Sequence, residues 1–468
     1  MRANGRTLQD GFESFLTPPP ESYARVLEAG LVSLDTNVLL DFYRYAKATR
    51  ADLAAILFKL NERLYVSHQV VVEFWRNREG TLKEYENSLA KVKEKITSLK
   101  KQGEDAVREW ANVISLPLKD RDQAVSAWTK GVGSLESRLD QLGARHRSAT
   151  SFNTNEDEVL HELDALLAGR VGDPPSVEEF TARRAEGARR QEELIPPGFE
   201  DSRKPPDRAI GDFLLWADVM EEAKSRGLDL LLVTRDSKSD WWHKGGGGHP
   251  LPLRELQAEF NAMTGRRLYM LPTADFLRLG AKAFGLHVRE ASITDADRVG
   301  RRTRRSVERE KSPIDKLGRV RSGETVLSLV ESMIELAEGA PSYDELISRY
   351  QRAFPDISVD SEARRRIGNL FSLGLVSLQG ETVVITPAGR VLMRSHDIRH
   401  LQQAFLDRIL GAQVILAAVK SGQPWASLRE DPPVGMSATQ VGHVLRWLSR
   451  LGLLADDAQG SLVDEEGS

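Results

Sequence analysis

Short apolar runs alternate with amphipathic segments at the start of the chain. The runs at 31–34 and 64–66 have the length of buried strands, and each precedes a segment with apolar residues every three or four positions. After residue 190 this rhythm returns, with strands expected at 228–233 and 267–271 and helices beside them. A repeated strand–helix order favours a parallel sheet, so the sequence predicts an α/β domain.

A long charged segment from about 81 to 190 separates the two α/β parts. Its apolar residues are spaced by three or four, as in a long amphipathic helix: Leu82, Tyr85, Leu89, Val92, Ile96 and Leu99. Further helices are predicted at 122–142 and 159–167. We therefore expect a helical, coiled-coil-like insertion. It is an arm for homo-oligomerisation, a clamp over substrate, or a hairpin packed on its own domain.

The pattern changes again near residue 300. Residues 301–321 contain nine Lys or Arg and three acids, which indicates a basic linker. Three short helices and a β-hairpin around Gln379-Gly380 are then predicted, in the order of a winged helix: 324–338, 343–354, 361–373 and 376–385. A partial recurrence over 401–452 indicates a second winged-helix-like (α+β) unit.

These patterns together predict a discontinuous first domain followed by smaller ones. In chain order the expected parts are the α/β domain's first part at 1–79, the helical insertion at 80–190, the second part at 191–290, the basic linker at 291–322, winged-helix-like domains at 323–396 and 397–458, and a disordered tail at 459–468.

Composition narrows the classes of protein. A length of 468 residues allows roughly three domains, and a net charge of −4 argues against a uniformly basic chain. The absence of Cys excludes disulfides, thiolate metal sites and a Cys nucleophile, so a metal would need oxygen or imidazole ligands. Since no signal peptide or apolar membrane span is visible, we expect a soluble cytoplasmic protein.

Four carboxylates fall where a parallel sheet binds ligands. Asp35 and Asp236 follow two predicted strands, while Glu73 and Asp212 lie on neighbouring helices. Clustered acids repel one another unless a cation neutralises them, and Mg²⁺ or Mn²⁺ prefers oxygen ligands. Such a metal activates water and stabilises charge on a phosphodiester, so phosphodiester hydrolysis is the reaction that this chemistry suits best.

The segments LVSLDTNVLLDFYR, LYVSHQVVVEFWRNR, IPPGFEDSRKPPDRAIGDFLLWADVM and LLLVTRDSKSDWW resemble, in this order, the motifs of PIN-like domains. The last of these segments resembles the final motif of one branch of PIN-like domains, T-x-D-x-K-x-D-W-W. The resemblance covers about 1–79 and 190–285. It implies a three-layer α/β/α fold with a parallel sheet and metal-dependent nuclease activity, with Asp35, Glu73, Asp212 and Asp236 as the acids.

The same resemblance gives roles to further residues. It implies that Asn37 and Thr234 position the acids and that Asp240 ligates a second metal ion. Trp241 and Trp242 are expected to be packed in the domain, although stacking on a base is an alternative.

Several cations are candidates for nucleic-acid binding. Arg76 and Lys238 either contact a phosphate or pair with a motif acid. In the predicted winged helix, three consecutive arginines suit phosphates or a major groove, although winged helices also bind proteins: Arg364, Arg365 and Arg366.

The main hypothesis is a Mg²⁺- or Mn²⁺-dependent endonuclease that acts on RNA or DNA. A toxin-like or phage-defence effector is a more specific form of it. The alternative is a non-catalytic DNA-binding regulator or scaffold that uses the winged-helix tail.

Overall fold

The computed structural model describes residues 15–147, 150–201, 205–243, 251–309, 311–316, 325–357, 359–433 and 435–454. The chain divides into two compact units. Unit 1 comprises 1–175, 217–236 and 259–299, and unit 2 comprises 176–216, 237–258 and 300–468. The predicted tail at 459–468 and, within the predicted basic linker, residues 310 and 317–322 lie outside the described residues.

A four-stranded parallel sheet forms the centre of unit 1. Its strands are β1 (Leu31–Leu34), β2 (Leu64–Tyr65), β3 (Leu230–Val233) and β6 (Leu268–Leu271), in the order β2-β1-β3-β6. Every strand residue is buried, as expected for a parallel sheet covered by helices on both faces. The prediction of an α/β fold with a parallel sheet is confirmed.

The strand order creates a switch point between β1 and β3. From β1 the chain continues to β2 on one side, whereas from β3 it continues to β6 on the other. Connections that leave neighbouring strands in opposite directions open a crevice beyond the carboxyl ends of those strands. The chain segments that leave β1 and β3 therefore start at the edge where α/β sheets bind ligands.

Helices of unit 1 surround this sheet. Helix α1 (Pro20–Ala29) packs on β1 and β3 and on α11 (Thr273–Phe284), which also packs on α3 (Lys47–Leu60). The other helices are α2 (Thr36–Asp41), α6 (Glu158–Leu167) and parts of α9 (Gly211–Arg226), α10 (Arg254–Thr264) and α12 (Glu290–Arg309). The segment predicted as a basic linker thus begins as the helix α12.

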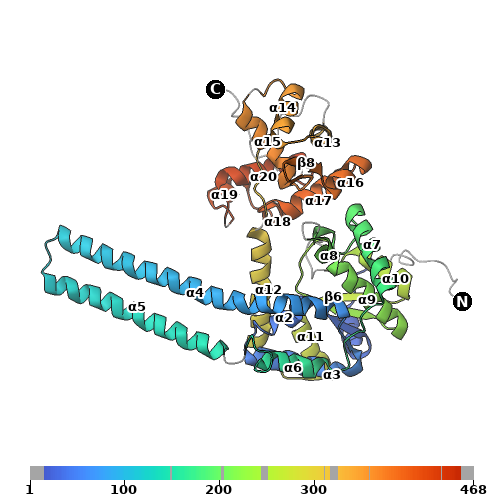
Figure 1. The fold of residues 1–468 in the computed structure, drawn as a ribbon, viewed down its shortest axis with the longest axis horizontal. Coiled ribbons are helices and arrows are strands. Elements are labelled where there is room, and N and C mark those ends of the chain that lie inside the picture. Colours follow the sequence, from blue (N-terminus) through green and yellow to red (C-terminus); the bar gives the residue numbers. More distant parts are fainter. Residues whose placement is uncertain are drawn as a thin grey trace. The chain divides into compact units, whose positions relative to one another are not determined.

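The insertion is a hairpin of two long helices. Helix α4 (His68–Val113) begins directly after β2, where Ser67 caps it by accepting from Val70 N. It continues without a break past residue 80 and pairs with α5 (Leu118–Arg147), as Figure 1 shows. Glu73 therefore lies on the same helix that forms the arm, so the helical insertion grows out of the α/β domain itself.

A buried ion pair fastens the base of this hairpin to the sheet domain. Arg78 on α4 contacts Asp157, and both side chains are almost fully buried. The Asp157 carboxylate also caps α6 by accepting from Val159 N and Leu160 N, and it accepts from Tyr43 Oη at 2.7 Å. One carboxylate thus joins the helix that leaves the domain to the helix that returns to it.

Unit 2 begins with α7 (Val177–Glu193), whose capping box pairs Ser176 with Glu179. It also contains α8 (Pro206–Ala209) and the two-stranded pair of β4 (Trp242–His243) and β5 (Leu251–Pro252). Trp241 and Trp242 are buried, as predicted, and Trp241 packs edge-to-face on Trp216.

The C-terminal part of unit 2 contains three helices followed by a β-hairpin. These are α13 (Val326–Ala337), α14 (Tyr343–Ala353), α15 (Asp360–Ser372), β7 (Val376–Gln379) and β8 (Thr382–Ile385). Gly380 has a φ of 64° in the predicted turn, a conformation that glycine adopts without strain. The elements follow the predicted order, and their classification as a winged helix stays a prediction.

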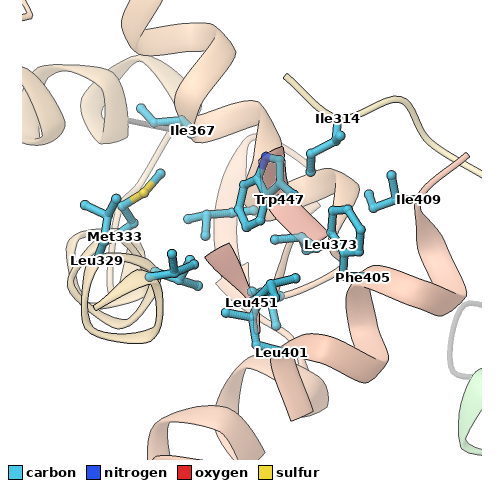
Figure 2. Close-up of a cluster of buried hydrophobic side chains, with 14 of the residues drawn as sticks. Ile314, Leu329, Met333, Ile367, Leu373, Leu401, Phe405, Ile409, Trp447 and Leu451 are labelled. Atoms are coloured by element: carbon cyan, nitrogen blue, oxygen red, sulfur yellow. The ribbon is translucent and has the colours of Figure 1, made fainter. Parts of the chain in front are cut away.

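One hydrophobic core joins this part to the remaining helices α16 (Pro387–Ser395), α17 (Ile398–Arg408), α18 (Ala412–Lys420), α19 (Trp425–Glu430) and α20 (Ala438–Arg450). Figure 2 shows Trp447 stacked beside Phe405 at the centre of this core. The Trp447 Nε1 group donates to Asp315 O at 2.9 Å, which holds the incoming chain. The two predicted C-terminal domains thus share one core.

A partly buried histidine gives this core a pH dependence. Burial lowers the pKa of His443, whose ring lies 3.3 Å from Ile314 O. The unfolded chain therefore binds more protons at mildly acidic pH, and stability is lost as the pH falls below the ordinary histidine pKa of about 6.5. We expect His443→Gln to weaken this loss, as measured by urea unfolding above and below that pH; an unchanged pH dependence would contradict the assignment.

No helix among the described residues is both long and apolar enough to cross a membrane.

Candidate functional site

A hydrogen-bonded set of side chains lies at the switch point between β1 and β3. The last residues of these strands, Leu34 and Val233, are in register, so Asp35 and Thr234 follow them side by side. Thr234 Oγ1 donates to Asp35 Oδ2 at 2.6 Å. Asn37 Nδ2 contacts the same carboxylate oxygen and lies 3.2 Å from Thr234 Oγ1. Three predicted site residues are therefore brought together by the two neighbouring strands.

Asp35 occupies the N-cap position before α2, but its side chain does not cap the helix. It precedes α2 with an extended backbone, but its side chain makes no capping hydrogen bond. An aspartate in this position normally accepts from the backbone N–H of the first turn. Here the carboxylate is turned to Thr234 and Asn37 instead, and Asp35 is only partly buried. The Asp35 side chain therefore does not serve as a helix cap.

The segment after β3 is fixed by the same residues. Thr234 Oγ1 accepts from Asp236 N at 2.9 Å, and Asn37 Oδ1 accepts from Arg235 N at 2.8 Å. Asp236 is partly buried. Thr234 and Asn37 thus hold the backbone that carries Asp236.

Glu73 is oriented by two residues that the sequence did not single out. Thr36 Oγ1 donates to Glu73 Oε2 at 3.2 Å, and Gln69 Nε2 donates to Glu73 Oε1 at 2.7 Å. Thr36 stands between Asp35 and Asn37, so it links α4 to the segment after β1. Gln69 lies one helical turn before Glu73, a spacing that could have identified it.

Asp41 is a nearby acid with a different role. Its carboxylate is fully buried and pairs with Arg235 at 2.8 Å and Arg44 at 3.0 Å. Burial raises the pKa of Asp41, whereas the two guanidinium groups act in the opposite direction. Because the Asp41 carboxylate is buried between two cations, it holds α2 to the segment after β3 and is not available to a substrate.

A second group of motif residues lies within unit 2. Lys238 Nζ contacts Asp212 at 3.1 Å and Asp201 at 2.9 Å, and Trp241 Nε1 donates to Asp212 at 3.3 Å. Of the two interpretations of Lys238, the partner of a motif acid is the one that its geometry favours. The sequence assigns no role to Asp201, yet Asp201 contacts the same lysine as Asp212.

Asp240 is completely buried in unit 2. Its Oδ2 atom accepts from Gly198 N at 2.9 Å and from Glu200 N at 3.3 Å. These bonds fasten the 198–200 loop, and Glu200 in turn accepts from Ser239 N. The geometry therefore favours a loop-holding role for Asp240.

The arginines that are predicted to contact nucleic acid differ in their partners. Arg76 is exposed on α4, one turn beyond Glu73. On α15, Arg364 pairs with Asp344 at 2.8 Å and Arg366 pairs with Glu362 at 2.5 Å, whereas the exposed Arg365 donates to Ser361 O. Arg364 and Arg366 are thus engaged with acids, and Arg76 and Arg365 are exposed.

The acids near the switch point carry the donor atoms that a divalent metal ion prefers. Asp35, Glu73 and Asp236 offer only oxygen atoms, which suits Mg²⁺ or Mn²⁺. Across the described part of the chain, however, no three acidic or histidine side chains are arranged to hold one ion. The chemistry of the donors therefore fits such a metal, while the spacing of the side chains does not by itself form a three-ligand site.

Comparison with known proteins gives one match. Residues 31–256 match a family model described as a PIN like domain, a nuclease-type fold. Neither the curated proteins nor the solved structures include a significant match to the chain.

Proposed function

We propose that the PIN-like domain at residues 31–256 makes this chain a divalent-metal-dependent nuclease that hydrolyses phosphodiester bonds of RNA or DNA. The observation that carries the proposal is the Asp35 carboxylate, which is held by Thr234 and Asn37 at the switch point of the sheet instead of capping α2. A carboxylate oriented in this way lies outside the carboxyl ends of the strands, where open α/β sheets bind their ligands.

Asp35, Glu73 and Asp236 would hold the metal ion. Asp212 and Asp240 remain predictions from motif order as further ligands. When bound, Mg²⁺ or Mn²⁺ supplies Lewis acidity that lowers the pKa of water and offsets charge developing on the phosphodiester.

The side chains around these acids supply orientation. Thr234 and Asn37 fix the rotamer of Asp35, and Thr36 and Gln69 fix that of Glu73. Acids that are already oriented lose little conformational entropy when they bind a ligand. We also propose that Arg76 contacts a substrate phosphate, because it is exposed on the same helix as Glu73.

Removing the Thr234 hydroxyl is expected to lower cleavage by about 10- to 100-fold, the usual cost of losing a residue that orients a metal ligand. In Thr234→Val the shape is kept, but Asp35 loses a 2.6 Å donor and Asp236 N loses its acceptor. Thr234→Ser retains the hydroxyl and should retain most activity. Equal loss in both variants, measured as kcat on one substrate, would indicate a packing effect instead.

The function itself is tested with a panel of labelled RNA, single-stranded DNA and duplex DNA. Purified full-length protein is incubated with each substrate in Mg²⁺, in Mn²⁺ and in a chelator. The proposal expects cleavage of at least one polymer that the chelator stops. Absence of cleavage on all of them would favour the non-catalytic alternative.

A further inference from the structure

The hairpin of α4 and α5 carries an apolar stripe that its own packing leaves exposed. Residues seven positions apart lie on the same side of a helix, because seven residues make about two turns. We define the exposed stripe by six such residues, of which each is between 40% and 79% exposed: Val92, Leu99 and Val113 on α4, and Trp128, Leu135 and Leu142 on α5.

The inner seam of the hairpin is formed mostly by other residues. Val132 and Ala111 are buried, and the side chain of Leu89 lies against Gly143. Trp128 belongs to both the seam and the stripe: its ring packs over Gly103 and its Nε1 donates to Lys100 O at 2.9 Å, yet the residue stays 40% exposed. Figure 1 shows that α4 and α5 run antiparallel along each other. Because the seam uses similar heptad positions of the two helices, we expect the two exposed rows on one face of the hairpin.

This stripe differs from ordinary surface apolar residues. Single exposed apolar side chains are common, whereas a strict heptad on two paired helices is typical of a coiled coil in which both rows are buried. Here the seam covers single residues such as Ala111 and Val132, whereas the residues of the stripe are exposed. A four-helix bundle is the arrangement that buries both rows.

The charges along α4 favour a second copy as the occupant. Residues 89–101 contain five lysines and one glutamate, whereas residues 102–113 contain three acids and one arginine. An α4 helix that lies antiparallel on α4 of another copy sets each basic block against an acidic one. The two blocks meet at residues 102–103, midway between Val92 and Val113.

We propose that the exposed stripe docks on the same stripe of a second copy of this chain, with the two α4 helices antiparallel, and forms a four-helix bundle. The overlap from Val92 to Val113 is about 30 Å long at 1.5 Å per residue. Helix α4 also carries Glu73, so the arm that joins the two copies is continuous with the helix of a proposed metal ligand.

Molar mass in solution tests the proposal independently of any enzyme activity. Full-length protein should have twice its chain mass of 52.2 kDa by sedimentation or light scattering. The double variant Leu99→Glu, Leu135→Glu should be monomeric, with the helical circular dichroism retained, because both side chains are already exposed.

The matched control is Thr97→Glu, Ser137→Glu. Thr97 and Ser137 are exposed and lie two positions from Leu99 and Leu135, which is about 200° round each helix. The two substitutions therefore introduce the same charges on the other side of the helices. The control should remain dimeric. A monomeric wild type overturns the proposal and would leave the stripe to another protein or to nucleic acid. A dimer that persists in Leu99→Glu, Leu135→Glu also overturns it. So does a dimer that is lost equally in the control variant.

Orientation is tested by cross-linking, which the absence of native cysteine makes specific. Oxidation of the double variant Val92→Cys, Val113→Cys should join two chains, whereas either single variant should not. Cross-linking of a single variant to itself, or none in the double variant, would contradict antiparallel α4 helices.

Discussion

Substitution of Asp35 by Asn is expected to lower metal-dependent cleavage by about 10³-fold or more, since a metal ion contributes several kcal/mol of charge stabilisation and each 1.4 kcal/mol is tenfold. The amide has the same shape and still accepts from Thr234 Oγ1, so the fold should be kept. It lacks the negative charge that holds a hard cation.

The measurement is single-turnover cleavage, combined with calorimetric titration of Mn²⁺ into the wild type and the variant. Asp164→Asn, at an exposed position on α6, is the matched control and should behave as the wild type. If Asp35→Asn cleaves at the wild-type rate, Asp35 is not a metal ligand. Weaker Mn²⁺ binding by the variant would supply evidence that does not depend on activity.

Loss of the buried Arg78–Asp157 pair is expected to produce the largest change in stability. Asp157→Ala leaves the Arg78 guanidinium almost fully buried and without its carboxylate, and it removes the cap of α6. Breaking a buried ion pair in this way costs about 3–5 kcal/mol. Tyr43 also loses the acceptor of its hydroxyl. The free energy of unfolding from urea titration is the measurement.

An exposed ion pair on the same helix gives the control. Lys83 and Glu79 are 3.5 Å apart with both side chains largely in solvent, so Glu79→Ala should change stability little. If Asp157→Ala is no more destabilising than Glu79→Ala, the base of the hairpin is not held by this pair.

The strands and the positions of the acids could be predicted because they depend on local pattern. Four-residue apolar runs at 31–34 and 230–233 are buried on both faces, and a polar residue directly after such a run must lie at the sheet edge. The order of the motifs also gave the resemblance to PIN-like domains, and a PIN-like family model matches residues 31–256.

The contacts that orient the acids depend on the fold and were not predictable. Asp35 looks like a helix cap in sequence, and only the register of β1 with β3 brings Thr234 to it. Thr36 and Glu73 are 37 residues apart, and Arg78 and Asp157 are 79 residues apart. Such pairs are set by packing between elements, which a local pattern does not encode.

The start of the insertion depends on how far one helix extends. The sequence predicts a new helical region from residue 80, whereas α4 begins at His68 and continues through Gly80 to Val113. The arm is therefore continuous with the helix that presents Glu73.

The central claim, that this chain is a metal-dependent nuclease centred on Asp35, is tested most directly by the cleavage rate of chelator-treated protein as Mn²⁺ is added back. The account predicts no cleavage without metal, a rate that rises with Mn²⁺ to saturation for the wild type, and almost none for Asp35→Asn. Cleavage that is independent of Mn²⁺, or equal in the two proteins, would contradict it.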